Sequence, residues 1–159
     1  MAIFITDYYN SPIGTIRIQY SDIGLSALTF EKSESNPSGK FPELDECRKQ
    51  LDEYFAGKRR EFNIPLDLNG TDFQKSVWNE LLKIRFGQTI SYSLLARKLG
   101  NLKAIRAVAN ANAKNPVSII VPCHRVTGTG GNLTGYAGGL WRKKWLLDHE
   151  KQLYQTQLL

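Results

Sequence analysis

Apolar and polar residues alternate in three short segments near the amino terminus, over residues 3–9, 14–20 and 25–30. The alternation is clearest around Ile16 and Ile18, and turn residues such as Pro12, Gly14 and Gly24 separate the segments. A period of two is typical of strands that bury one face. The pattern therefore predicts a small antiparallel sheet.

Helical spacing replaces this alternation further along the chain. Apolar residues recur every three or four positions from Leu44 to Phe55, which predicts a helix that packs one face. The stretch Thr71-Asp72-Phe73-Gln74 matches a capping box, so a second helix should begin there, and Gly87 should end it. We predict an α/β (α+β) protein with two domains, an amino-terminal α/β structural domain over 1–70 and a helical domain over 71–159.

Two short helices in the second half are joined by Gly100 and Asn101. Ser91 can cap the first of them and Asn101 the second, which should end before Asn115-Pro116 because a residue before proline avoids helical angles. This pattern suits a winged helix-turn-helix-like motif, although an ordinary helical hairpin fits it equally well. The second helix carries alanine at positions 104, 107, 109, 111 and 113, with Lys103 and Arg106 among them. Small side chains allow a helix to approach a groove closely, and this favours DNA binding.

Charge divides the chain in the same place. Residues 1–70 hold 8 Lys and Arg against 11 Asp and Glu, net −3, while residues 71–159 hold 13 against 4, net +9. A basic domain attracts polyanions, nucleic acid above all, although many basic faces are only solvated. No run is long and apolar enough to span a membrane, and the two cysteines and two histidines show no zinc-ligand spacing. We expect an intracellular protein without a metal.

The candidate chemistry lies at Cys123-His124, between the apolar run Val117–Val121 and a segment in which six of the thirteen residues 127–139 are glycine. We predict that the apolar run is a short buried strand. A thiol acts as a nucleophile in its thiolate form, which an adjacent imidazole helps to produce. The alternative is a small buried hydrophobe beside a structural histidine. Cys47 lies on the apolar face of the first predicted helix, where packing is its expected role.

Glu150 adds a third group to this candidate site. It lies three residues after Leu147 and three before Leu153, so the last predicted helix, from about Leu140, should turn the carboxylate inward. A buried carboxylate needs a partner. His124 is the preferred partner, and the alternative is a solvent-side pair with Lys143 or Lys144. Cys123, His124 and Glu150 would then form a relay of thiol, base and orienting carboxylate.

Four motifs carry a family resemblance in this order and spacing: Asn115-Pro116, Val121-Pro122-Cys123-His124-Arg125-Val126, Gly135-Tyr136-Ala137-Gly138-Gly139 and Leu146-Leu147-Asp148-His149-Glu150. The chain resembles the O6-alkylguanine-DNA alkyltransferase family, specifically over about residues 71–151 and only loosely before that. The resemblance implies irreversible, single-turnover repair of double-stranded DNA, in which the alkyl group of O6-alkylguanine moves to a cysteine. O4-alkylthymine is a candidate second substrate. We also expect a cytoplasmic monomer that needs no cofactor, and no metal, because the amino-terminal zinc ligands found in some members of the family are missing here.

The resemblance assigns roles to individual residues. Cys123 is the alkyl acceptor, His124 a base acting through a water, Glu150 the residue that orients His124, and Asn115 the residue that holds the active-site turn. The expected substrate-binding residues are Tyr92, Val126, Tyr136 and Ala137. The expected DNA-binding residues are Arg106, which replaces the flipped base in the stack, with Lys103, Ala107, Asn112 and Arg125.

Two positions depart from the family pattern. Ala137 stands where serine is often found, and Asn112 where a larger apolar residue is frequent. Three other functions stay open on the sequence. A helix-turn-helix regulator would not need Cys123, a non-transferring sensor would bind alkylated DNA unchanged, and a cysteine hydrolase would turn over repeatedly through a thioester.

Overall fold

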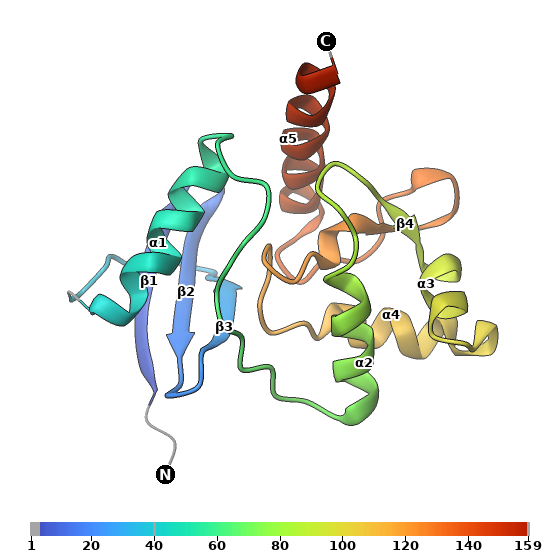
Figure 1. Ribbon diagram of the computed structural model, residues 1–159, viewed down its shortest axis with the longest axis horizontal. Helices are drawn as coiled ribbons and strands as arrows, with labels where there is room; N and C mark the ends of the chain where they lie inside the picture. The colour runs from blue at the N-terminus through green and yellow to red at the C-terminus, as the bar shows by residue number, and fades with distance from the viewer. Residues whose placement is uncertain (1–3, 40, 159) are drawn as a thin grey trace. The chain divides into compact units, whose positions relative to one another are not determined.

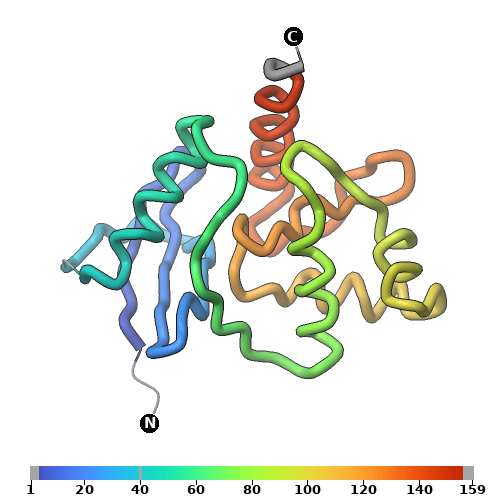
Figure 2. Tube along the Cα trace, in the orientation of Figure 1, coloured from blue at the N-terminus to red at the C-terminus, as the bar shows by residue number. Residues whose placement is uncertain are grey.

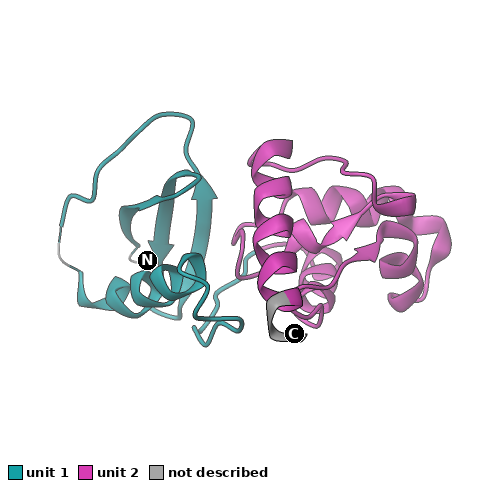
Figure 3. Ribbon diagram, turned by 90° about the horizontal axis from the view of Figure 1, so that it is seen from above, with its two compact units in different colours: residues 1–69 teal, residues 70–159 magenta. Residues whose placement is uncertain are grey.

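The computed structural model describes residues 4–39 and 41–158, which fold as two compact units divided between Asn69 and Gly70 (Figure 3). The first unit contains strands, one long helix and connecting loops. The second unit is mainly helical and contains both histidines and all candidate catalytic residues. The α+β class predicted from the sequence is therefore confirmed.

The first unit is built on a three-stranded antiparallel sheet in the order β1-β2-β3 (Figure 1). Its strands are β1 (Ile5–Ser11), β2 (Gly14–Tyr20) and β3 (Leu25–Phe30). Ile16 pairs with Tyr9 on one side, and Ile18 pairs with Leu28 on the other. These side chains are buried, as the alternation predicts.

Helix α1 (Pro42–Phe55) packs against β2 and completes the core of this unit. Leu44, Leu51 and Tyr54 lie on its buried face, together with Cys47. Burial raises the pKa of the Cys47 thiol to about 12. Cys47 is therefore a packing residue, as its helical position indicates.

The second unit consists of helices and 3₁₀ turns with two short strands, and its elements can be followed in Figure 1. They are α2 (Asp72–Leu81), β4 (Ile90–Ser91), α3 (Tyr92–Lys98), the 3₁₀ turn η1 (Leu102–Ala104), α4 (Ile105–Ala113), the 3₁₀ turn η2 (Cys123–Arg125), β5 (Val126–Thr127), the 3₁₀ turn η3 (Thr129–Gly131) and α5 (Leu140–Leu158). The predicted capping box at the start of α2 is confirmed. The Thr71 hydroxyl accepts from the Gln74 amide at 3.1 Å, and the Gln74 side chain accepts from the Thr71 amide at 2.9 Å.

Helices α3 and α4 form the predicted helix-turn-helix. Ser91 caps α3 by accepting from the Leu94 amide at 3.0 Å, and Gly100 ends it with a φ of +83°, a conformation that glycine adopts without strain. The second helix begins with the 3₁₀ turn η1, where Asn101 accepts from the Lys103 amide at 3.0 Å. The buried Trp78 of α2 fixes α4 from behind by donating its indole N–H to the Ala111 carbonyl at 2.8 Å.

Candidate active site

Cys123, in η2, follows a tight turn of the backbone. The strand predicted over Val117–Val121 is therefore wrong. The run is buried, but its backbone turns repeatedly before reaching η2 (Figure 2). Asn115 explains the difference, because its side chain takes the hydrogen bonds that a strand partner would otherwise supply. Its Oδ1 accepts from the Val117 amide at 3.0 Å, and its Nδ2 donates to the Val121 carbonyl at 2.7 Å.

This turn places Cys123 in the interior, 6% exposed. Burial raises the pKa of its thiol, while Asn115 and the charge of Lys143 act in the opposite direction. A buried neutral thiol needs a base to remove its proton before it can react. The adjacent residue His124 is such a base, and it is fully buried.

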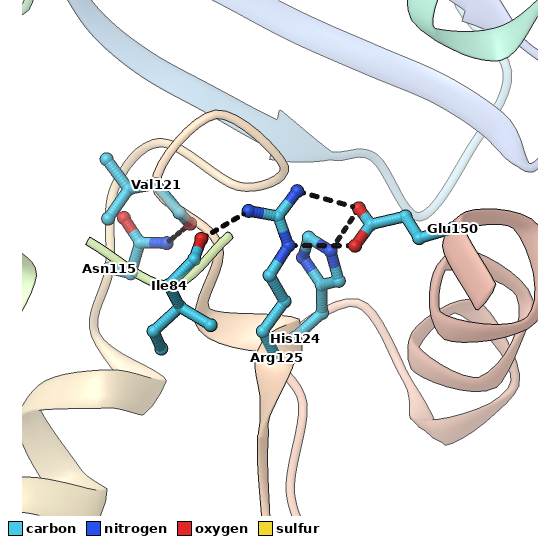
Figure 4. Close-up of polar contacts among 6 residues, drawn as sticks. All are labelled: Ile84, Asn115, Val121, His124, Arg125 and Glu150. Atoms are coloured by element: carbon cyan, nitrogen blue, oxygen red, sulfur yellow. Dashed lines mark hydrogen bonds and ion pairs between the residues drawn. The ribbon is translucent and has the colours of Figure 1, made fainter. Parts of the chain in front are cut away.

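Glu150 faces His124, as the helical spacing of α5 predicts. The two side chains meet at 2.7 Å between His124 Nε2 and Glu150 Oε2 (Figure 4). With the Nε2 proton donated to the carboxylate, Nδ1 carries the free lone pair. Nδ1 is buried and has no hydrogen-bond partner among the described residues. Burial lowers the pKa of His124, against the attraction of Glu150, so the imidazole is a neutral base near pH 7.

Arg125 does not lie on the DNA-binding surface, and it joins the contact between His124 and Glu150. It was expected on the DNA-binding surface, but it is buried, with 6% of its surface exposed, and its guanidinium binds Glu150. Nε donates to Oε1 at 2.8 Å, Nη2 to Oε2 at 3.1 Å, and Nη1 to the Ile84 carbonyl at 2.7 Å (Figure 4). A buried carboxylate draws a nearby cation inward because each charge compensates the other.

These contacts keep Glu150 ionised. Burial alone would raise the pKa of its carboxyl group, but the charge that His124 carries once it is protonated in acid, and the hydrogen bonds from His124 and Arg125, hold this pKa well below its usual range. Arg125 is therefore a buried partner of Glu150 in addition to His124, the partner that the sequence predicts. Neither Lys143 nor Lys144 is its ion-pair partner in the described part of the chain.

A cavity of about 580 Å³ lies where α4 faces the glycine-rich segment. Its lining includes Tyr92 and Arg106, which were both predicted as site residues, and the loop residues Thr134 and Gly135. The Tyr92 hydroxyl donates to the Thr134 carbonyl at 3.4 Å. The size of this cavity suits a small aromatic ligand.

Asn112 also lines this cavity, and its predicted position on the DNA-facing surface of the helix is wrong. The side chain is buried, 3% exposed, and Nδ2 donates to the Cys123 carbonyl at 3.4 Å. Asn112 lies one position after the buried Ala111 and four after the buried Val108, so it shares the inward face of α4. Its amide belongs to the interior near the nucleophile.

The other predicted residues divide between surface and interior. Arg106 and Ala107 are exposed on α4, and Lys103 is exposed on η1. Val126 is buried in β5, which pairs in parallel with Ile90 of β4. In the glycine-rich segment, Ala137 is exposed, while burial raises the pKa of Tyr136 well above its usual value.

Lys143 is a further candidate, for which the sequence predicts only a role as an alternative partner of Glu150. The side chain is fully buried, and Nζ donates to the Thr134 carbonyl at 2.9 Å and the Gly135 carbonyl at 3.3 Å. The spacing offered a signal, because Lys143 precedes the buried Leu146 by three residues and Glu150 by seven. It therefore lies on the inward face of α5.

A second cavity of about 580 Å³ has Glu150 in its lining, with Leu147 and Tyr154, but neither Cys123 nor His124. Within residues 4–39 and 41–158, no group of three or more His, Cys, Asp and Glu side chains could hold a metal ion. No helix in these described ranges is long and apolar enough to cross a membrane.

Both units match family models that belong to the same protein. Residues 72–152 match the family model for the DNA-binding domain of 6-O-methylguanine DNA methyltransferase. Residues 5–68 match the model for the ribonuclease-like domain of the same protein.

Named relatives and solved structures match over nearly the full length. A methylated-DNA--protein-cysteine methyltransferase of Mycobacterium leprae is 47% identical, over 94% of this chain and 93% of that protein. The enzyme of the same name from Methanosarcina acetivorans is 45% identical, over 89% and 95%. The crystal structure of Mycobacterium tuberculosis O6-methylguanine methyltransferase superimposes with a TM-score of 0.86 at 41% identity, covering 94% of both chains. A structure of that organism's OGT in complex with DNA gives 0.85 at 43% identity, covering 92% of both.

Proposed function

The chain belongs to the 6-O-methylguanine DNA methyltransferase family, and from that premise we propose that it repairs DNA by moving an alkyl group from guanine O6 to its own Cys123. The observation that carries the assignment of residues is the buried contact between His124 and Glu150, directly beside the thiol. We also infer that the protein acts in the cytoplasm as a monomer, without a cofactor.

The first step of the reaction is the removal of the thiol proton from Cys123. The Cys123 Sγ–H gives its proton through a water to Nδ1 of His124, the nitrogen that the Glu150 contact leaves basic. Glu150 and Arg125 fix the plane and tautomer of the imidazole, so the base is already oriented when substrate arrives. The thiolate then attacks the alkyl carbon bound to guanine O6.

In the displacement, a bond forms between Sγ and the alkyl carbon while the bond from that carbon to O6 breaks. The electron pair leaves with guanine, and a hydrogen bond from Tyr92 to the ring nitrogen stabilises the departing anion. Guanine then takes up one proton, which balances the proton that His124 removed from Cys123. Val126 accepts from the exocyclic amine through its carbonyl. The product is a thioether, which has no polarised carbonyl for water to attack, so each molecule reacts once.

DNA binding rests on the helix-turn-helix. Lys103 and Arg106 are exposed there beside the small side chain of Ala107. Extruding a base from the duplex costs a few kcal/mol, and Arg106 offsets part of that cost by entering the stack in its place. The extruded base enters the cavity lined by Tyr92 and Asn112.

The direct test is the intact mass of the protein after incubation with a duplex that contains one O6-methylguanine. We expect one added methyl group per molecule, and peptide mapping should place it on Cys123. An identical duplex with unmodified guanine and the Cys123→Ala variant serve as controls.

Other outcomes of the same experiment would contradict the proposal. A methyl group on the Cys47 peptide would refute the choice of acceptor. Tight binding of the methylated duplex without a change in mass would identify a damage sensor. Consumption of many lesions per protein molecule would identify a hydrolase.

A further inference from the structure

We propose that Asn112 selects guanine in the base pocket, by accepting a hydrogen bond from the exocyclic amine of the flipped base through its side-chain Oδ1. The inference rests on the proposed function and adds a specificity-determining contact to it. It gives Asn112 a role inside the pocket, where the sequence predicts a role on the DNA-facing surface.

The first observation is an unpaired acceptor in the wall of the cavity at α4. Asn112 lines this cavity, and its side chain is buried, with 3% of its surface exposed. Its Oδ1 is buried and has no hydrogen-bond partner among the described residues. Buried amide oxygens normally have a partner, because burying one unpaired costs free energy. The pocket therefore holds an acceptor that a donor on a ligand can satisfy.

The other end of the carboxamide determines which atom is left unpaired. Asn112 Nδ2 donates to the Cys123 carbonyl at 3.4 Å. Turning the amide over would place Oδ1 against that carbonyl, and two acceptors cannot bond to each other. Burial raises the pKa of Tyr92, and a hydrogen bond from the Asn112 side chain lowers it. The Nδ2 end therefore faces Cys123 and Tyr92, and Oδ1 is the end that stays free.

These two neighbours place Asn112 along one edge of the bound base. In the proposed reaction Cys123 takes the alkyl group from O6, and Tyr92 donates to a ring nitrogen. Guanine carries its exocyclic amine on the same edge as O6, with one ring nitrogen on either side of the amine-bearing carbon. A side chain that contacts both Cys123 and Tyr92 therefore lies beside the amine.

Tyr92 controls the space in front of Asn112. In the free protein the Tyr92 hydroxyl donates to the Thr134 carbonyl at 3.4 Å, and both residues line the cavity with Asn112. When the base enters, the hydroxyl leaves Thr134 for the ring nitrogen. This movement makes Oδ1 accessible to the amine.

The chemistry of the substrate matches a single free acceptor. The exocyclic amine provides the only N–H donors of a neutral O6-alkylguanine base, because alkylation at O6 leaves the ring nitrogens without hydrogen. In the proposed function the Val126 carbonyl accepts from one N–H of the amine, which leaves the other for Asn112. O4-alkylthymine has no N–H group on its base, so the contact with Asn112 favours guanine.

The test is a double cycle between the protein and the base. Asn112→Leu replaces the carboxamide with an apolar group of similar size, and O6-methylhypoxanthine is O6-methylguanine without the amine. Second-order rate constants for methyl transfer are measured for the parent and the variant, with duplexes that differ only at this base. Asn110→Leu is the matched control, because Asn110 lies on the same helix and lines the same cavity but is exposed.

Asn112→Leu should slow transfer from O6-methylguanine about tenfold more than transfer from O6-methylhypoxanthine, as expected for the loss of one hydrogen bond. Loss of the contact with the Cys123 carbonyl affects both bases alike, so it cancels in this ratio. Asn110→Leu should leave the ratio at the parent's value. Equal losses on the two bases in Asn112→Leu would overturn the inference, whereas an absence of transfer in the parent would overturn the proposed function itself.

A second measurement covers an Asn112→Leu variant that does not fold. Cys123→Ser removes the thiol, so this protein can be bound to each duplex without reacting. The side-chain carbonyl carbon of Asn112 should move downfield in NMR spectra with the O6-methylguanine duplex, because accepting a hydrogen bond deshields it, and should move less with O6-methylhypoxanthine. The same shift with both duplexes, or no shift with either, would refute the contact.

Discussion

Arg125 changes what the catalytic relay can do. In a relay of Cys123, His124 and Glu150 alone, the full negative charge of Glu150 would act on the imidazole. The guanidinium of Arg125 neutralises much of that charge. Glu150 raises the pKa of His124, and Arg125 lowers it. The pair therefore orients the imidazole firmly without making it strongly basic, which keeps it neutral and ready to accept a proton near pH 7.

Substitutions at the two partners of His124 should therefore act in opposite directions. Glu150→Gln should lower the pKa of His124 and reduce the transfer rate at neutral pH, since the imidazolium that forms loses its counter-charge. Arg125→Met should raise the pKa of His124. Transfer rates against pH, measured by stopped flow, should show the limb assigned to the base moving down in the first variant and up in the second.

Double variants test whether these residues act as one unit. Combining Glu150→Gln with His124→Ala should cost less than the sum of the single losses, because members of one relay are not additive. Affinity for DNA should stay near that of the parent. Additive losses, or pH limbs that move in the same direction, would mean that Glu150 is only structural.

The same side chains predict the response of stability to acid. The pKa of His124 is lowered from 6.5 by folding and that of Glu150 from 4.5, so below each of these values the unfolded chain binds more protons than the folded chain. Their stabilisation is present above these values and is lost as the pH falls, first through His124 and then through Glu150. The melting temperature should fall as the pH drops below about 6.5. A His124→Phe variant should lack the first part of that fall, and an identical curve would contradict the assignment.

Elements differ in how far the sequence predicts them. The starts of α2 and α3 depend on side chains of Thr71, Gln74 and Ser91 that bond to amides within three residues, so the local pattern was sufficient. The inward direction of Glu150 follows from helical spacing for the same reason. By contrast, α2 ends at Leu81, well before the predicted stop at Gly87.

The turn before Cys123 and the burial of Arg125 escaped prediction because their causes are not local patterns. Val117–Val121 has the composition of a strand, but Asn115 satisfies its backbone, and Ile119 adopts a φ of +71°, which is rare for a β-branched residue. Arg125 finds its partner 25 positions away on α5. A charge pattern along the chain cannot show such a contact.

Replacing Asn115 tests how much this turn matters. Asn115→Ala removes a donor and an acceptor in a buried region, and each unsatisfied group costs about 1–3 kcal/mol, so we expect a loss of about 2–4 kcal/mol in the free energy of unfolding. The transfer rate should fall further than the fraction folded. Urea unfolding and transfer rates would measure both effects, with the exposed Asn79→Ala of α2 as control. A folded variant with the parent's transfer rate would exclude a role in placing Cys123.

The exposed helix α4 makes a separate prediction about DNA. Arg106→Ala should slow transfer from duplex DNA much more than reaction with free O6-benzylguanine, because Arg106 is proposed to fill the stack and not to act on the thiol. Arg97→Ala on α3 removes an exposed positive charge elsewhere in the same motif and should affect both substrates little. Equal losses on both substrates in Arg106→Ala would refute its role in base flipping.

For the molecule as a whole, the charge difference between the two halves dominates DNA binding. Residues 71–159 carry net +9, and α4 presents alanines where a sequence-reading helix would present long polar side chains. Binding should therefore vary little with sequence and fall steeply with salt. If about six phosphates are contacted, affinity should drop about a thousandfold between about 50 and about 200 mM salt. Fluorescence anisotropy with several unrelated duplexes would measure this, and a strong preference for one operator-like sequence would favour a regulator.

The position of the two thiols sets a limit on repair in the cell. Cys123 is the only cysteine in residues 70–159, and Cys47 is buried in the other unit with a thiol pKa of about 12, so no second thiol can relieve the first of its alkyl group. Each repaired lesion therefore consumes one protein molecule, and damage lowers the number of active molecules in the cell. Survival against an alkylating agent should hold level up to a threshold dose and then fall, and the number of molecules per cell should set that threshold. Faster variants would clear lesions sooner without moving it.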